Sequence, residues 1–336
     1  MKRLVLLLIA VLAAPLSAAP FTVQATGQGY AQLSDAVNAI GEGEGTILIA
    51  PGVYRQCAVQ NAGRITYRAI QPRTAIFEVM TCEAKAALVV RGRGATVDGL
   101  VFRNFFVPDG NGSGIRLERG TLDVTNSVFR DSEQGILSGR DDPQAEVRID
   151  RSTFSGLGRC DRGLSCAHSV YFGLIKSVTV RHSRFERGAG GHYVKSRAAE
   201  IEVSDCSFDD SHGHTTNYMI DLPAGATGII ERNIFVQGAD KENHSAFIAV
   251  AAESRTNSSS GLVVLDNKAH QVDAATWPSA LVANWSEDQI IVERNEVGPR
   301  VIASRGAEQQ HAPSLSDKII EKLRDRAIKA KQKLIG

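Results

Sequence analysis

A short phrase of alternating apolar and polar residues recurs along most of the chain and usually ends in phenylalanine. The clear copies close at Phe102, Phe129, Phe154, Phe185, Phe208 and Phe235, and weaker copies close at Ala269 and Val297. Alternation of this kind predicts half-buried β-strands, because successive side chains point to opposite faces of a strand. The copies lie about 23 to 34 residues apart. That period is typical of a stacked solenoid and too short for independent domains.

Small polar residues stand two positions before the end of most copies. They are Ser127, Ser152, Ser183, Cys206, Asn233, Asn267 and Asn295. Ser and Asn side chains bond neighbouring backbone groups, as a tight turn stacked on itself requires. The repeats therefore predict an all-β fold, a right-handed parallel β-helix. The 336 residues, 43% hydrophobic with 31 glycines, suit a large core with many turns.

The two ends of the chain differ from the repeats. Lys2 and Arg3 precede an apolar run, and we expect residues 1–18 to be a signal peptide. Residues 19–310 form the predicted solenoid, in which helical spacing over residues 30–40 indicates an N-terminal capping helix and a strand follows up to Tyr54. Residues 311–336 predict a basic amphipathic helix, with Ser314 and Asp317 as its capping pair, docked on or trailing from the last coil.

Export would place the five cysteines in an oxidising compartment. The economical assignment is two local disulfides, Cys57 to Cys82 and Cys160 to Cys166. Cys206 would then be a buried free thiol, because it occupies a position held elsewhere by Ser or Asn. We expect a monomer in the periplasm or outside the cell, with no transmembrane segment, since no stretch after the leader approaches about 20 apolar residues.

Strands between the repeated phrases carry the unusual residues. Aligned on a buried aliphatic, they centre on Ile115, Ile136, Val170, Val194, Ile220, Ile248 and Leu281. The next residue of each must point outward, which gives Arg116, Leu137, Tyr171, Lys195, Asp221, Ala249 and Val282. Two positions further lie Glu118, Gly139, Gly173, Arg197, Pro223, Ala251 and Asn284. Two positions before the aliphatic lie Ser113, Gln134, His168, His192, Tyr218, Ala246 and Ser279.

This alignment predicts a ladder of Tyr171, Lys195 and Asp221 beside a pair formed by His168 and His192. A structural explanation exists for each residue alone, since the lysine and aspartate would form an ordinary surface ion pair. The titratable groups crowd neighbouring coils, whereas later coils carry small apolar residues at the same places. Their clustering favours a functional site on rigid strands.

Other ligand classes receive little support. A net charge of +1 gives no bulk attraction to nucleic acid, and the glycines near Gly92 do not lead from a strand into a helix as a dinucleotide site requires. His212 and His214, together with His192, offer a transition-metal alternative to a polar turn, and the acids near Asp109 and Asp141 form no recognised Ca²⁺ loop. We therefore expect neither a metal nor a cofactor.

The segments CAHSVYFG, GGHYVKSRA, NYMIDLPAGA and FIAVAAE, within residues 160–253, resemble the exported right-handed parallel β-helix proteins of proteobacteria, a group in the pectate-lyase-like superfamily. The likeness extends upstream through VYRQCAV and VPDGNGSGIRLE. It implies the fold, and through the wider superfamily a polysaccharide lyase, hydrolase or binding protein. The chain departs from the pattern after Pro223 and around Glu253, where glycines are expected.

The residues predict an action on an anionic, uronate-containing polysaccharide by β-elimination. Lys195 or a neutral histidine, His168 or His192, would be the base, Arg197 or Arg116 would hold the carboxylate, and Tyr171 would act near the leaving group. Asp221 would complete the centre, and Glu118, Tyr218 and Glu253 would join Arg116 in binding substrate. Hydrolysis fits less well, since it needs a carboxylate pair. The non-catalytic alternative is a polysaccharide-binding or cell-envelope structural solenoid.

Overall fold

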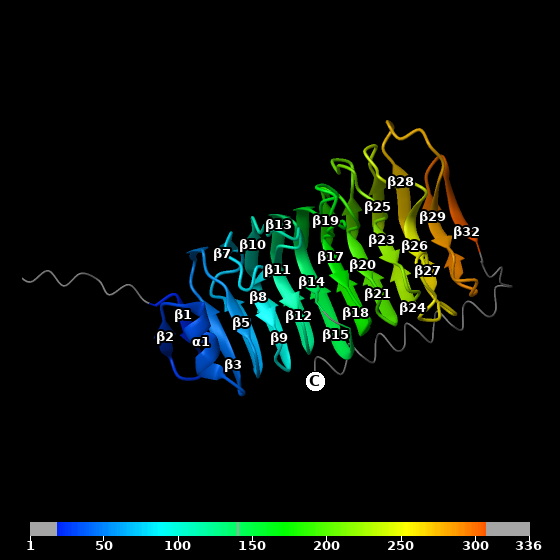
Figure 1. Cartoon of the computed structure of the whole chain (residues 1–336). Helices are drawn as coiled ribbons and strands as arrows, with labels where there is room; N and C mark the ends of the chain where they lie inside the picture. The colour runs from blue at the N-terminus through cyan, green and yellow to red at the C-terminus, as the bar shows by residue number, and fades with distance from the viewer. Residues whose placement is uncertain (1–18, 140, 307–336) are drawn as a thin grey trace, which may run out of the picture.

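A computed structural model describes residues 19–139 and 141–306 of the chain. In this part the chain forms one helix and many short strands, which stack along a single axis from the N-terminal to the C-terminal end (Figure 1). The strands make three long sheets, which we call A, B and C. The predicted solenoid of short strands is therefore confirmed.

Sheet A has twelve strands: β1 (Phe21–Val23), β2 (Gln28–Tyr30), β3 (Glu44–Ile49), β6 (Arg64–Ala69), β9 (Gly94–Asp98), β12 (Thr121–Thr125), β15 (Asp142–Asp150), β18 (Ile175–Arg181), β21 (Glu200–Ser204), β24 (Thr227–Glu231), β27 (Val263–Leu265) and β30 (Ile291–Glu293). Sheet B has ten: β4 (Gly52–Tyr54), β7 (Ala75–Glu78), β10 (Leu100–Arg103), β13 (Val128–Ser132), β16 (Thr153–Leu157), β19 (Arg184–Glu186), β22 (Ser207–Asp209), β25 (Ile234–Gln237), β28 (Lys268–Gln271) and β31 (Glu296–Val297). Sheet C has ten: β5 (Ala58–Gln60), β8 (Ala86–Val90), β11 (Ser113–Leu117), β14 (Gln134–Ser138), β17 (Val170–Phe172), β20 (Val194–Ser196), β23 (Ile220–Leu222), β26 (Ala246–Val250), β29 (Ser279–Asn284) and β32 (Val301–Gly306).

Each coil gives one strand to each sheet, so a strand pairs in parallel with the strand three places further along the chain. The exceptions are β1 and β2 at the N-terminal end, since β1 pairs antiparallel with both β2 and β3. Each repeated phrase contains two strands, one in sheet A and one in sheet B, with a bend between them. The segment ending at Tyr54 divides in the same way into β3 and β4.

The phenylalanines that close the phrases fill the interior beside sheet B. Phe102, Phe129, Phe154, Phe185, Phe208 and Phe235 stack in sequence, with neighbouring ring centroids 4.7 to 5.0 Å apart. This spacing matches the distance between paired strands, so one ring per coil makes a continuous column. The column explains why the sequence repeats phenylalanine at this position.

The bend between sheets A and B is held by the small polar column. Each backbone N–H of this column donates to the side chain at the same position of the next coil, as in Ser127 to Ser152 at 3.2 Å and Asn233 to Asn267 at 3.0 Å. The residue before each member of the column has a left-handed backbone conformation, for example His182 with φ of 47°. A backbone N–H at such a bend has no strand partner, and the stacked side chains supply one.

Both predicted disulfides are present. Cys57 bonds Cys82, and Cys160 bonds Cys166. Cys206 is the free and buried thiol that the sequence predicts. Burial raises the pKa of Cys206 to about 12, so this thiol stays protonated, and its sulfur accepts the backbone N–H of Ser183 at 3.5 Å as a member of the turn column.

The helix predicted near the N-terminus is α1 (Leu33–Ile40), which begins three residues later than expected. Leu33, Ala36 and Val37 are its buried residues, and it lies at the N-terminal end of the solenoid (Figure 1). Its role as a cap stays a prediction. The signal peptide and the C-terminal amphipathic helix lie outside the described residues. Within those residues, no helix is long and apolar enough to cross a membrane.

The alignment of the last site strand is wrong by one residue. Val282 of β29, rather than Leu281, pairs with Ile248 of β26, and Ala283 pairs with Ala249. All six residues of β29 are buried. Its four central residues are all apolar, so the sequence gives no alternation from which to read the register.

Candidate functional site

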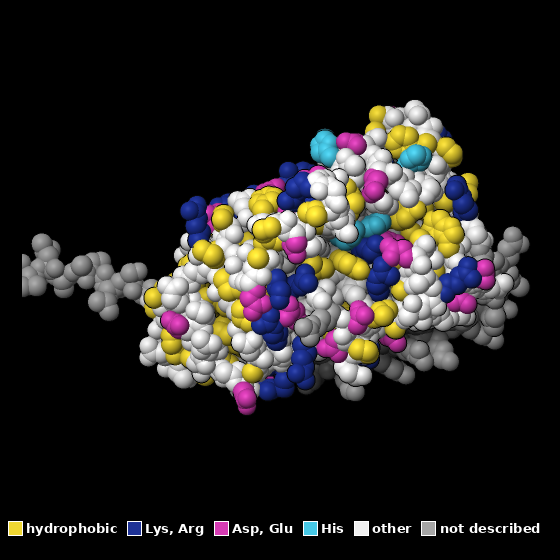
Figure 2. All heavy atoms as spheres, viewed as in Figure 1, with side chains coloured by type: hydrophobic (Ala, Val, Ile, Leu, Met, Phe, Trp, Pro, Cys, Tyr) yellow, Lys and Arg dark blue, Asp and Glu magenta, His cyan; other side chains and the backbone are white. Residues whose placement is uncertain are grey.

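The outer face of sheet C brings the predicted ladder together. Tyr171 of β17 pairs with Lys195 of β20, and Lys195 pairs with Asp221 of β23. Because the three are register partners, their side chains leave the same face of adjacent strands. Figure 2 shows histidine and cationic side chains meeting in a hollow in the middle of this face.

Lys195 is enclosed by two carboxylates. Its Nζ lies 2.6 Å from Oε1 of Glu253 and 3.2 Å from Oδ2 of Asp221. The other oxygen of Glu253 binds the guanidinium of Arg197, so this one carboxylate bridges both cations. We predicted exposed charges here, but Lys195 is only 8% exposed and Asp221 only 2%. Glu253, in the segment that follows β26, covers them.

Arg197 also joins the cations to Tyr171. Its Nε donates to the tyrosine hydroxyl at 3.0 Å, and Lys195 Nζ stands 5.7 Å from the centre of the tyrosine ring. The hydroxyl oxygen of Tyr171 accepts this bond, so its own hydrogen remains free to donate. The tyrosine is only partly buried.

The predicted pair of His168 and His192 is present, with stacked rings whose centroids lie 5.0 Å apart, and Tyr218 extends the stack at 5.7 Å from His192. The backbone N–H of His192 donates to Nδ1 of His168 at 3.0 Å, so a neutral His168 carries its hydrogen on Nε2. Nδ1 of His192 faces the carbonyl oxygen of Tyr218 at 3.2 Å and therefore carries a hydrogen. This leaves Nε2 of His192 as the basic nitrogen, 3.3 Å from Asp221 Oδ2.

Burial sets the protonation of this cluster. It lowers the pKa of His168 and His192 well below the usual value, and the Lys195 charge adds to the effect in both. Burial raises the pKa of Asp221 to about 6. Burial alone would lower the pKa of Lys195, but Asp221 and Glu253 outweigh it and raise that pKa. Neutral imidazoles thus stand beside a charged ammonium, and the base role considered for Lys195 is unfavourable.

Arg116 and Glu118 lie further along the same face, on or next to β11, three strands before β20. Glu118 is occupied by ion pairs with Lys85 at 2.8 Å and Arg91 at 2.6 Å. Arg116 lies over Gly139, where an added Cβ would stand 2.5 Å from its Nε. That Nε is buried and has no hydrogen-bond partner among the described residues. The structure therefore separates this pair from the Lys195 cluster, about 14 Å away by strand spacing.

Residues 86–297 match the family described as the right handed beta helix region. The chain belongs to the right-handed β-helix family. No curated protein matches the sequence significantly.

Two solved structures are similar to this right-handed β-helix protein. An alginate lyase from Paenibacillus sp. str. FPU-7 is 14% identical, with a TM-score of 0.45, over 83% of this chain and 96% of the other. The deglycosylated pectin methylesterase from Aspergillus niger is 14% identical, with a TM-score of 0.47, over 93% of this chain and 97% of the other. At this identity the likeness concerns the fold alone.

The corrected register of the β-helix reveals a residue that sequence reasoning missed. Because Val250 pairs with Asn284, the next residue, Trp285, stands in the column of Arg197, Pro223 and Ala251. Asn284 is instead buried, with its amide donating to the carbonyl of Asp288 at 2.9 Å. Trp285 is 41% exposed. The signal that could have found it is the tryptophan itself, which is rare in this chain.

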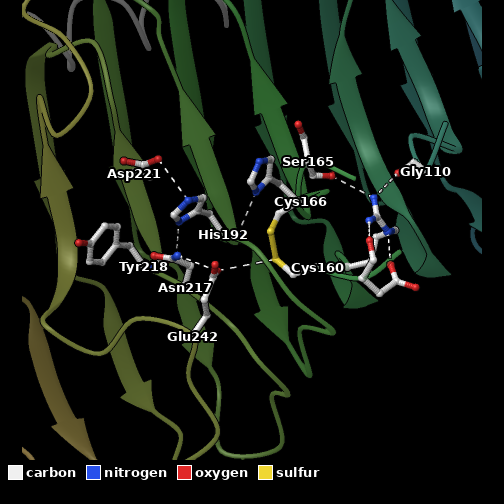
Figure 3. The surroundings of a disulfide bond; sticks show 12 residues. Gly110, Cys160, Ser165, Cys166, His192, Asn217, Tyr218, Asp221 and Glu242 are labelled. Atoms are coloured by element: carbon white, nitrogen blue, oxygen red, sulfur yellow. Dashed lines mark hydrogen bonds and ion pairs between the residues drawn. A yellow bond between two sulfur atoms is a disulfide. The ribbon is translucent and has the colours of Figure 1, made fainter. Parts of the chain in front are cut away.

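Beside the histidine stack, the Cys160–Cys166 disulfide closes a short loop (Figure 3). Glu242 accepts a bond from Asn217 at 2.8 Å and lies 3.7 Å from the sulfur of Cys160. Among the described residues, these two cysteines and Glu242 are the one group of three whose possible metal-ligand atoms lie within 4.8 Å of one another. The sulfurs are bonded to each other, so they offer no thiolate to a metal.

A second lysine and aspartate pair lies nearby and was also missed. Lys241 Nζ is 3.0 Å from Asp210 Oδ2, and both side chains are at most 1% exposed. Tyr193 and Thr216 donate to the same aspartate at 2.6 and 2.9 Å. These partners come from three different coils, which no local sequence pattern links.

Proposed function

We propose that the outer face of sheet C binds an anionic, uronate-containing polysaccharide and that the Lys195 and Arg197 pair receives a uronate carboxylate. The observation that carries this proposal is the carboxylate of Glu253, which bridges the two cations. Two cations spaced to share one carboxylate suit the carboxylate of a sugar acid equally well. Glu253 is 45% exposed in its side chain, so a ligand reaching the hollow displaces it without unfolding a strand.

β-Elimination is the reaction that these residues would support. The cations would neutralise the uronate carboxylate and make the hydrogen on the adjacent ring carbon more acidic. His192 Nε2 would accept that proton, since of the two stacked histidines it offers the unprotonated nitrogen not already used as an acceptor of a backbone N–H, and the imidazolium formed would be stabilised by Asp221 at 3.3 Å. The bond to the leaving oxygen would break as the ring double bond forms, and Tyr171 would donate a proton to that oxygen. His168, with its hydrogen on Nε2, would act as a donor that positions the stack.

Binding without turnover is the second candidate, and burial of the histidines favours it. His168 is 6% exposed and His192 is 8% exposed, so access to a basic nitrogen is narrow. A binding protein would use the same cations, together with Arg116 as a contact for a second carboxylate, and would need no base. Both candidates share the anionic ligand and differ only in chemistry.

Export to the periplasm or the exterior, a monomeric state, and end caps formed by α1 and the C-terminal helix belong to the same proposal. The two disulfides support an oxidising location. A cell-envelope glycan or an environmental polyuronate would be accessible there.

The test combines binding and turnover on a panel of uronate polysaccharides, with absorbance of the unsaturated product as the sign of elimination. Arg197→Ala should weaken binding by about 1.5 to 3 kcal/mol, the range for a charged hydrogen bond, and should lower product formation with it. Lys268→Ala, which removes an exposed cation of sheet B, is the matched control and should change neither. Binding without absorbance would select the second candidate. Absence of binding to every anionic polymer would reject the proposal.

Glu253→Gln separates displacement from catalysis. If Glu253 only occupies the place of the ligand, this variant binds the polysaccharide more tightly because the competing charge is gone. If Glu253 is instead part of the reaction, turnover falls while binding is retained or improved. Weaker binding in Glu253→Gln would show that Glu253 contacts substrate directly and would contradict the displacement step.

A further inference from the structure

Trp285 is the large exposed aromatic side chain beside the charged cluster. It directly follows β29, and its backbone N–H donates to the carbonyl of Val250 at 2.9 Å, which holds it beside the C-terminal end of β26. In the column of Arg197, Pro223 and Ala251, it stands three strands beyond Arg197, or about 14 Å. The two residues between them are small, so nothing bulky at these positions separates the tryptophan from the cations.

An apolar floor leads from the charged cluster to this tryptophan. Ala246, Ala249 and Ala283 pack with Tyr218 in one buried cluster. The Trp285 ring lies 6.3 Å from the Tyr218 ring, which in turn stacks on His192 at 5.7 Å. The aromatic row therefore begins inside the polar site and ends at an exposed indole.

This surface does not have the character of a protein or membrane interface. Polar groups border it: Arg255 donates to the carbonyl of Trp285 at 3.0 Å and pairs with Glu287 at 2.7 Å. A rigid aromatic face beside a polar cleft is instead suited to a ring that has one apolar face and a polar rim. A pyranose ring has that form.

We propose that Trp285, with the alanine floor before it, is a stacking subsite for a pyranose ring of the polysaccharide, so that the sugar chain lies along the solenoid axis. The identity of the polymer as a polyuronate rests on the proposed function. The stacking of a sugar ring on Trp285 does not depend on it. A sugar chain held at both Arg197 and Trp285 must span three strands. The site therefore selects oligosaccharides over single sugars.

The chain has two tryptophans, which makes the subsite directly observable. Trp277 lies elsewhere, with its Nε1 donating to Gln237 at 3.2 Å. In a Trp277→Phe protein all indole fluorescence comes from Trp285. Titration with oligogalacturonates and oligomannuronates of six units should change this emission saturably, and disaccharides should change it much less.

Affinity provides the second measurement. Trp285→Ala should weaken binding of the six-unit oligomers about tenfold, the size expected for losing one aromatic contact, and should leave binding of disaccharides unchanged. Trp285→Phe should restore most of the lost affinity, because phenylalanine also offers an aromatic face. The melting temperatures of both variants should equal that of the wild type, which excludes a merely structural role for the tryptophan. Ile234→Ala, which removes an equally exposed apolar side chain from sheet B, is the control.

The outcomes separate the two proposals. Wild-type binding of uronate oligomers with unchanged emission and unchanged affinity in Trp285→Ala overturns the stacking subsite alone. Binding of neutral oligosaccharides that depends on Trp285, without binding of uronates, supports the subsite and rejects the anionic ligand. Failure to bind any oligosaccharide of either charge overturns both.

Discussion

Two buried lysine and aspartate pairs lie within a few strands of each other and differ in how well they are satisfied. In the first, Asp210 accepts bonds from Tyr193, Thr216, the backbone of Gly238 and Lys241, and both charged side chains are sealed from solvent. In the second, Lys195 lies 3.2 Å from Asp221, whose Oδ1 has no hydrogen-bond partner among the described residues.

The contrast distinguishes a structural network from a site. A closed set of partners holds three coils together and leaves nothing for a ligand. The second pair keeps an unsatisfied oxygen, and its remaining partner, Glu253, is half exposed and displaceable. Ionisable groups that combine a shifted pKa with an unused hydrogen-bonding atom are typical of functional sites. A buried charge alone is not.

The largest expected effect is on stability. Lys241→Met should lower the free energy of unfolding by about 3 to 5 kcal/mol, because it leaves Asp210 buried without its counter-charge. Lys195→Met should cost less than about 2 kcal/mol, since Asp221 takes up a proton more readily than an ordinary carboxyl. Denaturant unfolding at neutral pH measures both. Equal losses would erase the distinction between the pairs.

The pH dependence of Asp221 gives the next largest effect. Its folded pKa of about 6 lies above the usual value of 3.8, so the folded protein binds more protons than the unfolded chain between these values. This group therefore favours folding below about pH 4, and that contribution is lost as pH rises through 6. Relative to the wild type, Asp221→Asn should gain about 3 kcal/mol between pH 4 and pH 7. Parallel stability curves for the two proteins would contradict the raised pKa.

Arg197→Ala sharpens the comparison from the functional side. It should change the free energy of unfolding by less than about 1 kcal/mol, because the guanidinium is partly exposed. It should weaken binding of an anionic oligosaccharide by about 1.5 to 3 kcal/mol, the range for a charged hydrogen bond. Calorimetric titration together with thermal unfolding measures both quantities. A large stability loss with unchanged binding would make this second cluster structural, like the first.

Arg116 offers the smallest effect and a matched pair of variants. Arg116→Ala should weaken binding of long anionic oligomers by about 1 kcal/mol and should not affect short ones that cannot reach it. Gly139→Ala should do the same without removing the charge, because the new Cβ would displace the guanidinium from its place. If Gly139→Ala binds long oligomers like the wild type while Arg116→Ala does not, the present position of Arg116 is irrelevant to binding.

The fold was predictable because its determinants repeat. Phe185 and Phe208 occupy equivalent positions in adjacent coils, and so do Ser183 and Cys206, so each copy of the phrase supports the others. The same equivalence placed Tyr171, Lys195 and Asp221 in one row. It failed at β29, where every residue is buried and the alternation that sets register is missing.

Other features of the site depend on contacts that no repeat encodes. Glu253 reaches back to Lys195 across 58 positions of sequence. Lys241 meets Asp210 through side chains from different coils. Lys195 is buried because Glu253 and Asp221 surround it. Its outward position on a strand does not reveal these partners, so the sequence alone suggested an exposed charge.

The column of small polar residues at the bend between sheets A and B gives the solenoid a direction. Each backbone N–H there depends on a side chain of the following coil, as Asn267 depends on Asn295, so support passes only from later coils to earlier ones. Removing coils from the C-terminal side would leave a backbone donor without an acceptor at the new end, whereas removal from the N-terminal side would free only side-chain groups of the column, such as the Asn295 amide that donates to the carbonyl of Val264 at 2.9 Å. Erosion at the two ends is therefore unequal, and a coil added after Asn295 would need its own Ser or Asn to extend the series.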